Sequence, residues 1–298
     1  MNFNNIIGNE QNKEFLTQIV NSNNIAHSYM FIGADSIGKL LFAKEFAKAI
    51  LCTNEEKPCN KCKSCIEFNT LNNPDFNIVE PDGNSIKIEQ IRELTKTVYE
   101  KPIVSARKVY IIDDSNLMTK EAQNSLLKTL EEPPEYVTII LIASNENQFL
   151  PTIRSRCTKI LFGNLKDNEL KLVLNKEYNY KDIPDIILKV ANGSVKRAIE
   201  LKDKEKEYEN VQKIFFNLES INIIDLINSK EEIFKNKEDV NGILEYINLI
   251  FFDKINTNTK YIECMKIVEN TKDRLRKNSN FDMTIDNLLL TVWEEING

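Results

Sequence analysis

The chain has 298 residues, of which 42% are hydrophobic and 28% are charged, and this composition excludes a wholly disordered protein. Its formal net charge of −6 argues against a general nucleic-acid coat protein, although it leaves room for a local DNA contact. No apolar run approaches the roughly 18–20 residues of a membrane span, and the N-terminal residues lack the features of a secretion signal. We therefore expect a cytoplasmic protein.

Residues 1–165 alternate short apolar runs with segments of helical periodicity. The apolar runs are rich in β-branched residues and lack polar alternation, which is typical of buried strands in a parallel sheet. We predict strands at Ser28–Ile32, Phe76–Glu80, Val109–Asp113, Thr138–Ala143 and Lys159–Phe162. Because helical segments separate these strands, the sequence predicts an α/β domain of the doubly wound type.

Two of the intervening helices are clearly marked. Apolar residues recur every four positions after Lys39, and a similar pattern follows Thr119, which we expect to cap the second helix. That helix must end near Glu132 because Pro133 and Pro134 cannot continue it.

Beyond Phe162 the strand signal fades and the periodicity becomes helical. Residues 166–204 form a small predicted helical unit with a break at 191–193, and residues 205–298 are charged and helical in period. We therefore predict three parts: an α/β domain at 1–165, a small helical domain at 166–204 and a C-terminal helical domain at 205–298.

The loop after the first predicted strand matches the pattern G-x-x-x-x-G-K, and a predicted helix follows it. This context supports a phosphate-binding loop, in which backbone N–H groups hold phosphate oxygens and Lys39 reaches the β- and γ-phosphates. However, Leu40 stands where a hydroxyl should ligate Mg²⁺. We predict a nucleotide site at Gly33, Gly38 and Lys39 that has lost catalysis; incidental glycines are the alternative.

A second nucleotide-site signal is the apolar strand that ends at Asp113 and Asp114. It has the layout of a Walker B motif, in which Asp113 helps to hold Mg²⁺. Active ATPases of this kind usually place a glutamate next, to position the attacking water, whereas Asp114 is one methylene shorter. Leu40 and Asp114 both weaken the prediction of ATP hydrolysis. The alternative is that the two acids cap the start of a helix.

Four of the six cysteines, Cys52, Cys59, Cys62 and Cys65, fall within fourteen residues. In a reducing compartment so tight a cluster favours a metal site over disulfides. Four thiolates surround one Zn²⁺ tetrahedrally and leave no open position, so we predict a structural zinc module at residues 52–65. Free or redox-active cysteines are the alternative.

These motifs, read together, resemble the AAA+ clamp-loader family of bacterial DNA polymerase III. The resemblance rests on residues 27–33, the cysteine cluster, the run Glu121–Pro134 and Ser155-Arg156-Cys157, and it covers roughly residues 1–205 closely. The run Gln-Asn-x-Leu-Leu-Lys-x-Leu-Glu-Glu-Pro-Pro joined to Ser-Arg-Cys is highly specific. It implies an AAA+ domain with an inserted zinc module, a helical lid at 166–204 and a C-terminal collar domain.

Within that family, the chain length, Leu40 and the Asp113–Asp114 pair resemble the delta-prime branch, whose nucleotide site is degenerate, more than the ATP-hydrolysing gamma/tau branch. The intact Gly38 and Lys39 keep ATP binding open. An active gamma/tau-like ATPase is the first alternative, and a zinc-stabilised ATP-binding module outside any ring is the second.

The resemblance further implies a pentameric ring with gamma/tau and delta subunits, which acts on the sliding clamp and on primer–template DNA. In it, Arg156 reaches the ATP site of a neighbouring subunit as an arginine finger, with Arg154 as the second choice. Ser144 or Asn145 takes the place of a polar sensor, and Arg197 resembles a second sensor. No basic patch with interleaved aromatic residues marks a DNA contact.

Overall fold

The computed structural model describes residues 3, 5–235 and 237–298, with the side chains of Ile186, Glu205, Glu207 and Glu238 left aside. Contacts divide the chain into two compact units. The first holds residues 1–179 and 193–195, and the second holds residues 180–192 and 196–298. The helix α7 (Asp167–Tyr178) therefore groups with the sheet, and the three-part division stays a prediction.

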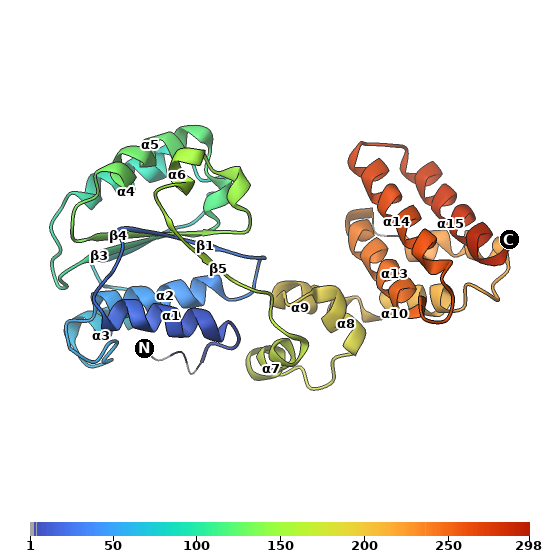
Figure 1. Cartoon of the computed structure of the whole chain (residues 1–298), viewed down its shortest axis with the longest axis horizontal. Coiled ribbons are helices and arrows are strands. Elements are labelled where there is room, and N and C mark those ends of the chain that lie inside the picture. Colours follow the sequence, from blue (N-terminus) through green and yellow to red (C-terminus); the bar gives the residue numbers. More distant parts are fainter. Residues whose placement is uncertain (1–2, 4, 236) are drawn as a thin grey trace. The chain divides into compact units, whose positions relative to one another are not determined.

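The first unit is built on a sheet of five parallel strands in the order β2-β3-β4-β1-β5 (Figure 1). The prediction of a five-stranded parallel sheet is therefore confirmed, and the observed bounds lie within one residue of the predicted ones. They are β1 (Ser28–Ile32), β2 (Phe76–Val79), β3 (Lys108–Ile112), β4 (Val137–Ala143) and β5 (Thr158–Leu161).

Helices cover both faces of this sheet, as a buried parallel sheet requires (Figure 1). On one face lie α1 (Glu10–Asn21), α2 (Lys39–Leu51) and α3 (Lys63–Asn69). On the other lie α4 (Ile88–Val98), α5 (Lys120–Glu131) and α6 (Pro151–Arg154). Short 3₁₀ turns stand at Ser115–Leu117 and Glu146–Gln148.

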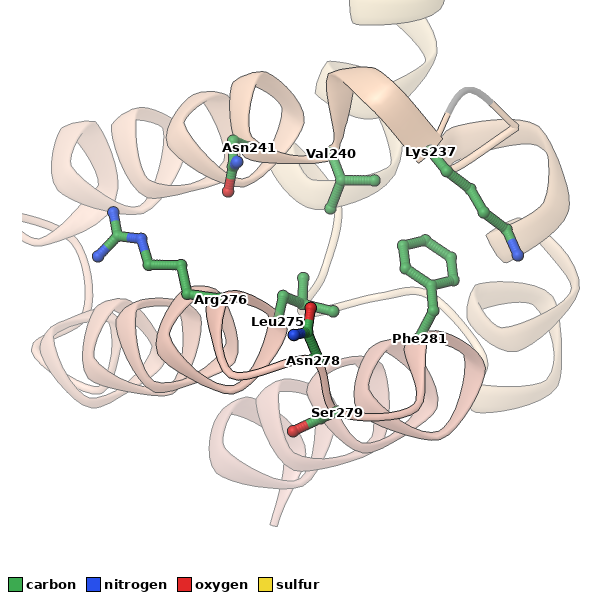
Figure 2. A pocket seen from close by; sticks show the side chains of 8 residues that line it. All are labelled: Lys237, Val240, Asn241, Leu275, Arg276, Asn278, Ser279 and Phe281. Carbon is green, nitrogen blue, oxygen red and sulfur yellow. The ribbon is translucent and has the colours of Figure 1, made fainter. Parts of the chain in front are cut away.

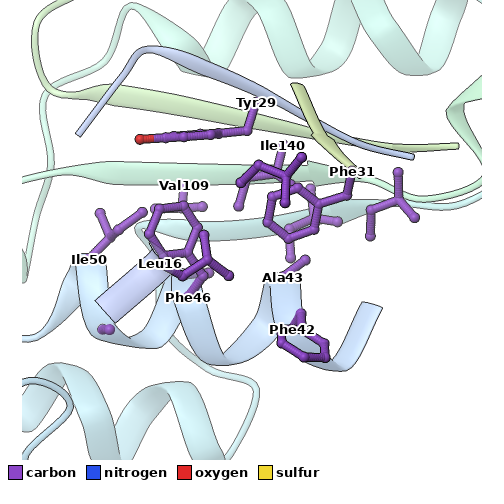
Figure 3. Packing of buried hydrophobic residues seen from close by; sticks show 14 of the residues in the cluster. Leu16, Tyr29, Phe31, Phe42, Ala43, Phe46, Ile50, Val109 and Ile140 are labelled. Carbon is purple, nitrogen blue, oxygen red and sulfur yellow. The ribbon is translucent and has the colours of Figure 1, made fainter. Parts of the chain in front are cut away.

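Each strand contributes alternate side chains to the two cores. In β1, Tyr29 and Phe31 join the core under α1 and α2, whereas Met30 and Ile32 face α4 and α5. The Tyr29 ring meets that of Phe46 from α2 edge-on, with centroids 5.1 Å apart (Figure 3). Both layers are apolar, which explains why these strands lack the polar alternation of a half-exposed sheet.

The predicted start and end of the helix after Thr119 are confirmed, and so is the break at residues 191–193. The Thr119 hydroxyl accepts a hydrogen bond from the N–H of Ala122 at 3.2 Å and so caps α5, which ends at Glu131 before the two prolines. The break at residues 191–193 is also present, because Asn192 and Gly193 take left-handed conformations there.

The second unit is helical in its described residues. It contains α8 (Asp185–Ala191), most of α9 (Val195–Asp203), α10 (Glu205–Phe216), α11 (Ile223–Asn228), α12 (Lys230–Ile233), a 3₁₀ turn at Lys237–Asp239, α13 (Val240–Lys254), α14 (Tyr261–Arg276) and α15 (Phe281–Asn297). Helices α13, α14 and α15 pack consecutively. None of the helices in the described residues combines the length and apolar character that a membrane span requires.

Candidate functional site

The predicted phosphate-binding loop lies between β1 and α2, where two glycines meet real structural demands. A side chain on Gly33 would lie 2.6 Å from the Phe162 carbonyl oxygen, so only glycine fits. Gly38 adopts φ 96° at the start of α2, in the region that favours glycine. The loop therefore has the strand–loop–helix setting that the motif predicts.

The loop's own backbone engages the side chain of Lys39. The Lys39 amino group is buried and donates hydrogen bonds to the carbonyl oxygens of Gly33 and Ala34, each at 2.6 Å. Burial lowers the pKa of Lys39, and the nearby carboxylates of Asp35, Asp114 and Asp113 partly offset this effect. The ammonium thus points at two carbonyl oxygens of its own loop.

Two further features shape the loop. Leu40 packs against the apolar core under α2, so the position of the Mg²⁺-ligating hydroxyl carries a side chain without any metal ligand. The carbonyl of Ser36 accepts a hydrogen bond from the N–H of Val195 at 3.1 Å, which ties the loop to the start of α9.

The acid pair follows β3 directly, as predicted. Asp113 is half-buried, and burial raises the pKa of its carboxyl above the ordinary value. Its Oδ1 accepts a hydrogen bond from the N–H of Asp114 at 3.0 Å, and Asp114 is exposed with φ 42°. The Asp113 carboxylate is close enough to Lys39 to offset part of the effect of burial, which lowers the pKa of its amino group. The acid pair and the loop therefore border the same site.

The sensor positions are engaged in local contacts. The N–H of Ser144 donates to Asn116 Oδ1 at 3.2 Å, just beyond β4, and Asn145 Oδ1 accepts from the N–H of Asn147 at 2.9 Å. In the second unit, Arg197 forms an ion pair with Glu245 of α13. Their proposed roles as sensors stay predictions.

The four clustered cysteines come together between the end of α2 and the start of α3. Their Sγ atoms all lie within 4.8 Å of one another. The edge of a tetrahedron of sulfurs around Zn²⁺, with bonds of ~2.3 Å, measures about 3.8 Å, so only a small contraction is needed. The donor set and its geometry therefore fit a metal such as zinc.

Backbone N–H groups already point at these sulfurs. Cys59 Sγ accepts from the N–H groups of Lys61 and Cys62, at 3.4 and 3.2 Å, and Cys62 Sγ accepts from the N–H of Cys65 at 3.4 Å. Burial opposes ionisation of Cys62, but hydrogen bonds from Thr53 and Cys65 outweigh it and lower the pKa of that thiol to about 6. Such bonds favour the thiolate form that a metal requires.

Arg156 stands at the rim of the first unit, just before β5. Its Nη1 donates to the Thr152 carbonyl oxygen at 2.8 Å, and its Nη2 forms an ion pair with Glu131 Oε1 at 2.9 Å. Its own carbonyl accepts from the Ser28 hydroxyl at 2.7 Å, which fixes the backbone to β1. Arg154 differs from it, because its Nε is buried without a hydrogen-bond partner among the described atoms.

Sequence analysis missed two side chains that shape this unit. Glu131 lies inside the run that carries the resemblance, but nothing in the sequence links it to Arg156. Asp75 is buried and accepts hydrogen bonds from the N–H groups of Ile103, Val104 and Ser105, at 2.7, 2.8 and 2.7 Å. A lone aspartate after proline gives no sequence signal for such a role.

The second unit contains a cavity of about 370 Å³ between α13, α14 and α15 (Figure 2). Lys237 and Arg276 stand at opposite ends of it, and Val240 and Leu275 lie between them (Figure 2). The Lys237 ammonium sits 4.8 Å from the centroid of the Phe281 ring, and Arg276 pairs with Asp273. None of the site residues predicted from the sequence lines this cavity.

Together, the strand–loop–helix with its lysine, the acids after β3 and the five-stranded parallel sheet define a P-loop α/β protein. The family model described as DNA polymerase III, delta subunit, matches residues 8–166, which is more than half of the chain. The chain therefore belongs to the AAA+ clamp-loader family of DNA polymerase III subunits.

Curated relatives carry the names of several subunits. The DNA polymerase III subunit delta' of Bacillus subtilis is 32% identical over 67% of this chain and 61% of its own length. The gamma/tau subunit of Mycoplasma genitalium is 34% identical over 72% of this chain and 37% of its own length. The chain thus spans less than two thirds of each of these relatives.

Among solved structures, a DNA polymerase III gamma subunit-related protein from Thermotoga maritima is similar at a TM-score of 0.44 and 19% identity. The match covers 95% of this chain and 99% of that one.

Proposed function

We propose that the chain is the delta-prime subunit of a DNA polymerase III clamp loader, a support subunit that does not hydrolyse ATP itself. The state of the phosphate-binding loop carries this proposal. Leu40 is partly buried and packs against the core where a hydroxyl would hold Mg²⁺. A leucine at this position opposes a correctly placed Mg²⁺·ATP, because it offers no metal ligand.

In this proposal Arg156 acts in trans, on the ATP site of a neighbouring subunit. Its guanidinium lies at the rim with about a third of the side chain exposed (34%), and it stays charged at any physiological pH. A guanidinium that meets the γ-phosphate stabilises the charge that spreads over its oxygens, an effect of roughly 10³–10⁵ in rate in comparable systems. Arg154 is the weaker candidate, because protein covers its Nε.

The cysteine cluster serves a structural role in the same proposal. Cys52, Cys59, Cys62 and Cys65 would hold one zinc ion, and four protein ligands leave no position for a substrate or water. The bound metal would tie the end of α2 to the start of α3, which supports the sheet from one face.

The proposed partners are the gamma/tau and delta subunits in a pentameric ring, with the sliding clamp and primer–template DNA reached through the complex. Relatives named as delta', gamma and tau subunits support membership of such an assembly. Residues 166–204 would then act as the lid, and residues 205–298 would act as the collar.

A catalytically active gamma/tau-like ATPase is the second candidate. Two observations favour it: Gly33, Gly38 and Lys39 are all present, and gamma/tau relatives reach 34% identity. The candidates differ in what the isolated chain does. A motor subunit binds and turns over ATP·Mg²⁺, whereas the proposed delta-prime subunit does not turn it over.

The test is to purify the chain, assay ATP hydrolysis alone, and then reconstitute it with the gamma/tau and delta subunits of the same organism. We expect no turnover by the isolated chain and DNA-stimulated turnover by the complex. Arg156→Ala should remove most of the stimulated rate, and Arg154→Ala is the matched control that should keep it. Brisk hydrolysis by the chain alone, or a full rate with Arg156→Ala, overturns the proposal.

A further inference from the structure

The guanidinium of Arg156 is held along one side by two groups of its own chain. An arginine side chain carries five N–H donors in a rigid plane. Nη1 donates to the Thr152 carbonyl oxygen at 2.8 Å, and Nη2 forms an ion pair with Glu131 Oε1 at 2.9 Å. The guanidinium makes no further hydrogen bond or ion pair among the described residues, so its remaining donors stay available for an incoming anion.

The two groups that hold the guanidinium, Glu131 and the Thr152 carbonyl, belong to α5 and α6, and both helices pack against the sheet. Glu131 is the last residue of α5, which buries Ala122, Leu126 and Leu130 against the sheet. Arg156 follows α6, whose Ile153 is buried in the same core. The pair therefore joins two packed helices, and its geometry is set by the core and not by a mobile loop.

The stability of the pair does not explain its presence. The Arg156 and Glu131 side chains are 34% and 47% exposed, and exposed ion pairs contribute little to folding. The pair can instead matter for the orientation of the Arg156 side chain. A long side chain that must meet a phosphate on another molecule loses rotational freedom on binding, and an anchored one has already lost part of it.

We infer that Glu131 is a positioning residue for Arg156, holding the guanidinium plane so that its remaining donors face the ATP site of the neighbouring subunit. The inference rests on the proposed function, because it assigns Glu131 a task only if Arg156 is the finger. The Thr152 carbonyl supplies the second fixed point. In this role Glu131 acts through Arg156 and not on the nucleotide.

The activity test uses the reconstituted complex. Glu131→Ala should lower kcat roughly tenfold at unchanged KM for ATP, since misplacement of a catalytic group acts on the chemical step. Glu131→Gln, which keeps an acceptor, should fall between Glu131→Ala and wild type. Glu132→Ala is the matched control, because Glu132 is exposed, adjacent and in no ion pair among the described residues; it should keep the full rate.

A double variant separates positioning from a general structural effect. Adding Glu131→Ala to Arg156→Ala should cause no further loss, since the two residues act as a unit. A further fall in the double variant overturns the inference. So does a full rate for Glu131→Ala while Arg156→Ala is impaired, and in that case the proposed function survives. A full rate for Arg156→Ala overturns both.

A second measurement needs no partner subunits. Nitrogen-15 relaxation of the Arg156 Nε–H group in the isolated chain reports how strongly the side chain is ordered. We expect a clear loss of order in Glu131→Ala and none in Glu132→Ala, with unchanged thermal unfolding in both. Equal order in wild type and Glu131→Ala overturns the inference.

Discussion

The amino nitrogen of Lys39 lies 2.6 Å from the carbonyl oxygen of Gly33, six residues earlier in the same loop. The same amino group also donates to the carbonyl oxygen of Ala34 at 2.6 Å. Leu40, the next residue, packs against the apolar core and offers no metal ligand. The predicted nucleotide site thus keeps its glycines, its lysine and Asp113, but lacks the hydroxyl that would ligate Mg²⁺ at position 40.

The first prediction concerns Mg²⁺. Because Leu40 cannot ligate the metal, Mg²⁺ should change the ATP affinity of the isolated chain by no more than about threefold. A fluorescent ATP analogue titrated in Mg²⁺ and in EDTA measures this. Leu40→Thr introduces the missing hydroxyl and should make binding tighter with Mg²⁺ than without. A tenfold or larger tightening of the wild type by Mg²⁺ would contradict the prediction.

The second prediction concerns zinc content. Metal analysis of reduced, freshly purified protein should find about one zinc per chain, held by the four clustered cysteines. Cys62→Ser should lose the metal on dialysis against a weak chelator, because one thiolate is missing. Cys264→Ala lies outside the cluster and should retain it. Wild-type protein without zinc would remove the basis for the module.

The third prediction concerns the two remaining cysteines. Burial raises the pKa of Cys157 to about 11 and that of Cys264 to about 12, from an ordinary 9.0. At pH 8 their thiolate fractions should be roughly 10²–10³ lower than that of an ordinary thiol. After zinc removal, a thiol reagent should therefore modify the partly exposed Cys59 and Cys62 quickly, and Cys157 and Cys264 only after unfolding.

The pH dependence of the same groups has a definite sign. Both thiols have folded-state pKa values above the unfolded one, so their contribution to stability is complete below pH 9. It is lost as the pH rises through the folded values of about 11 and about 12. Urea unfolding between pH 8 and 11 should show this loss in wild type and a smaller one in Cys157→Ala. Rapid modification of either thiol in the folded chain at pH 8 would refute the assignment.

The fourth prediction concerns Asp75, whose buried carboxylate holds the segment 103–105 beside β2. Asp75→Ala leaves three N–H groups without their charged acceptor, and we expect a loss of about 3 kcal/mol or more in unfolding free energy. Asp75→Asn, which keeps one acceptor oxygen, should lose less. Urea unfolding gives both values.

Asp82→Ala is the control for that measurement. Asp82 is 73% exposed and pairs only with Lys87 among the described residues, so its loss should cost less than about 1 kcal/mol. Equal effects of Asp75→Ala and Asp82→Ala would show that the three hydrogen bonds do not hold the segment.

Local sequence patterns predicted much of this architecture. The strands were found within one residue because both faces of the sheet are buried, so each strand is a continuous apolar run such as Thr138–Ala143. The cap at Thr119 and the cysteine cluster could also be predicted from the sequence, since each depends on residues close together in the chain.

Contacts between residues far apart in the chain could not be predicted from local sequence patterns. Glu131 and Arg156 are 25 positions apart, Asp75 and Ile103 are 28 apart, and Ser36 and Val195 are farther still. Their meeting depends on how α5, α6, β2 and the start of α9 pack, which periodicity does not encode. The sequence by itself determined the elements and the cysteine cluster, because spacing along the chain decides those. Only the tertiary structure decided which side chain restrains Arg156 and where Lys39 directs its charge, because both depend on groups brought together by packing.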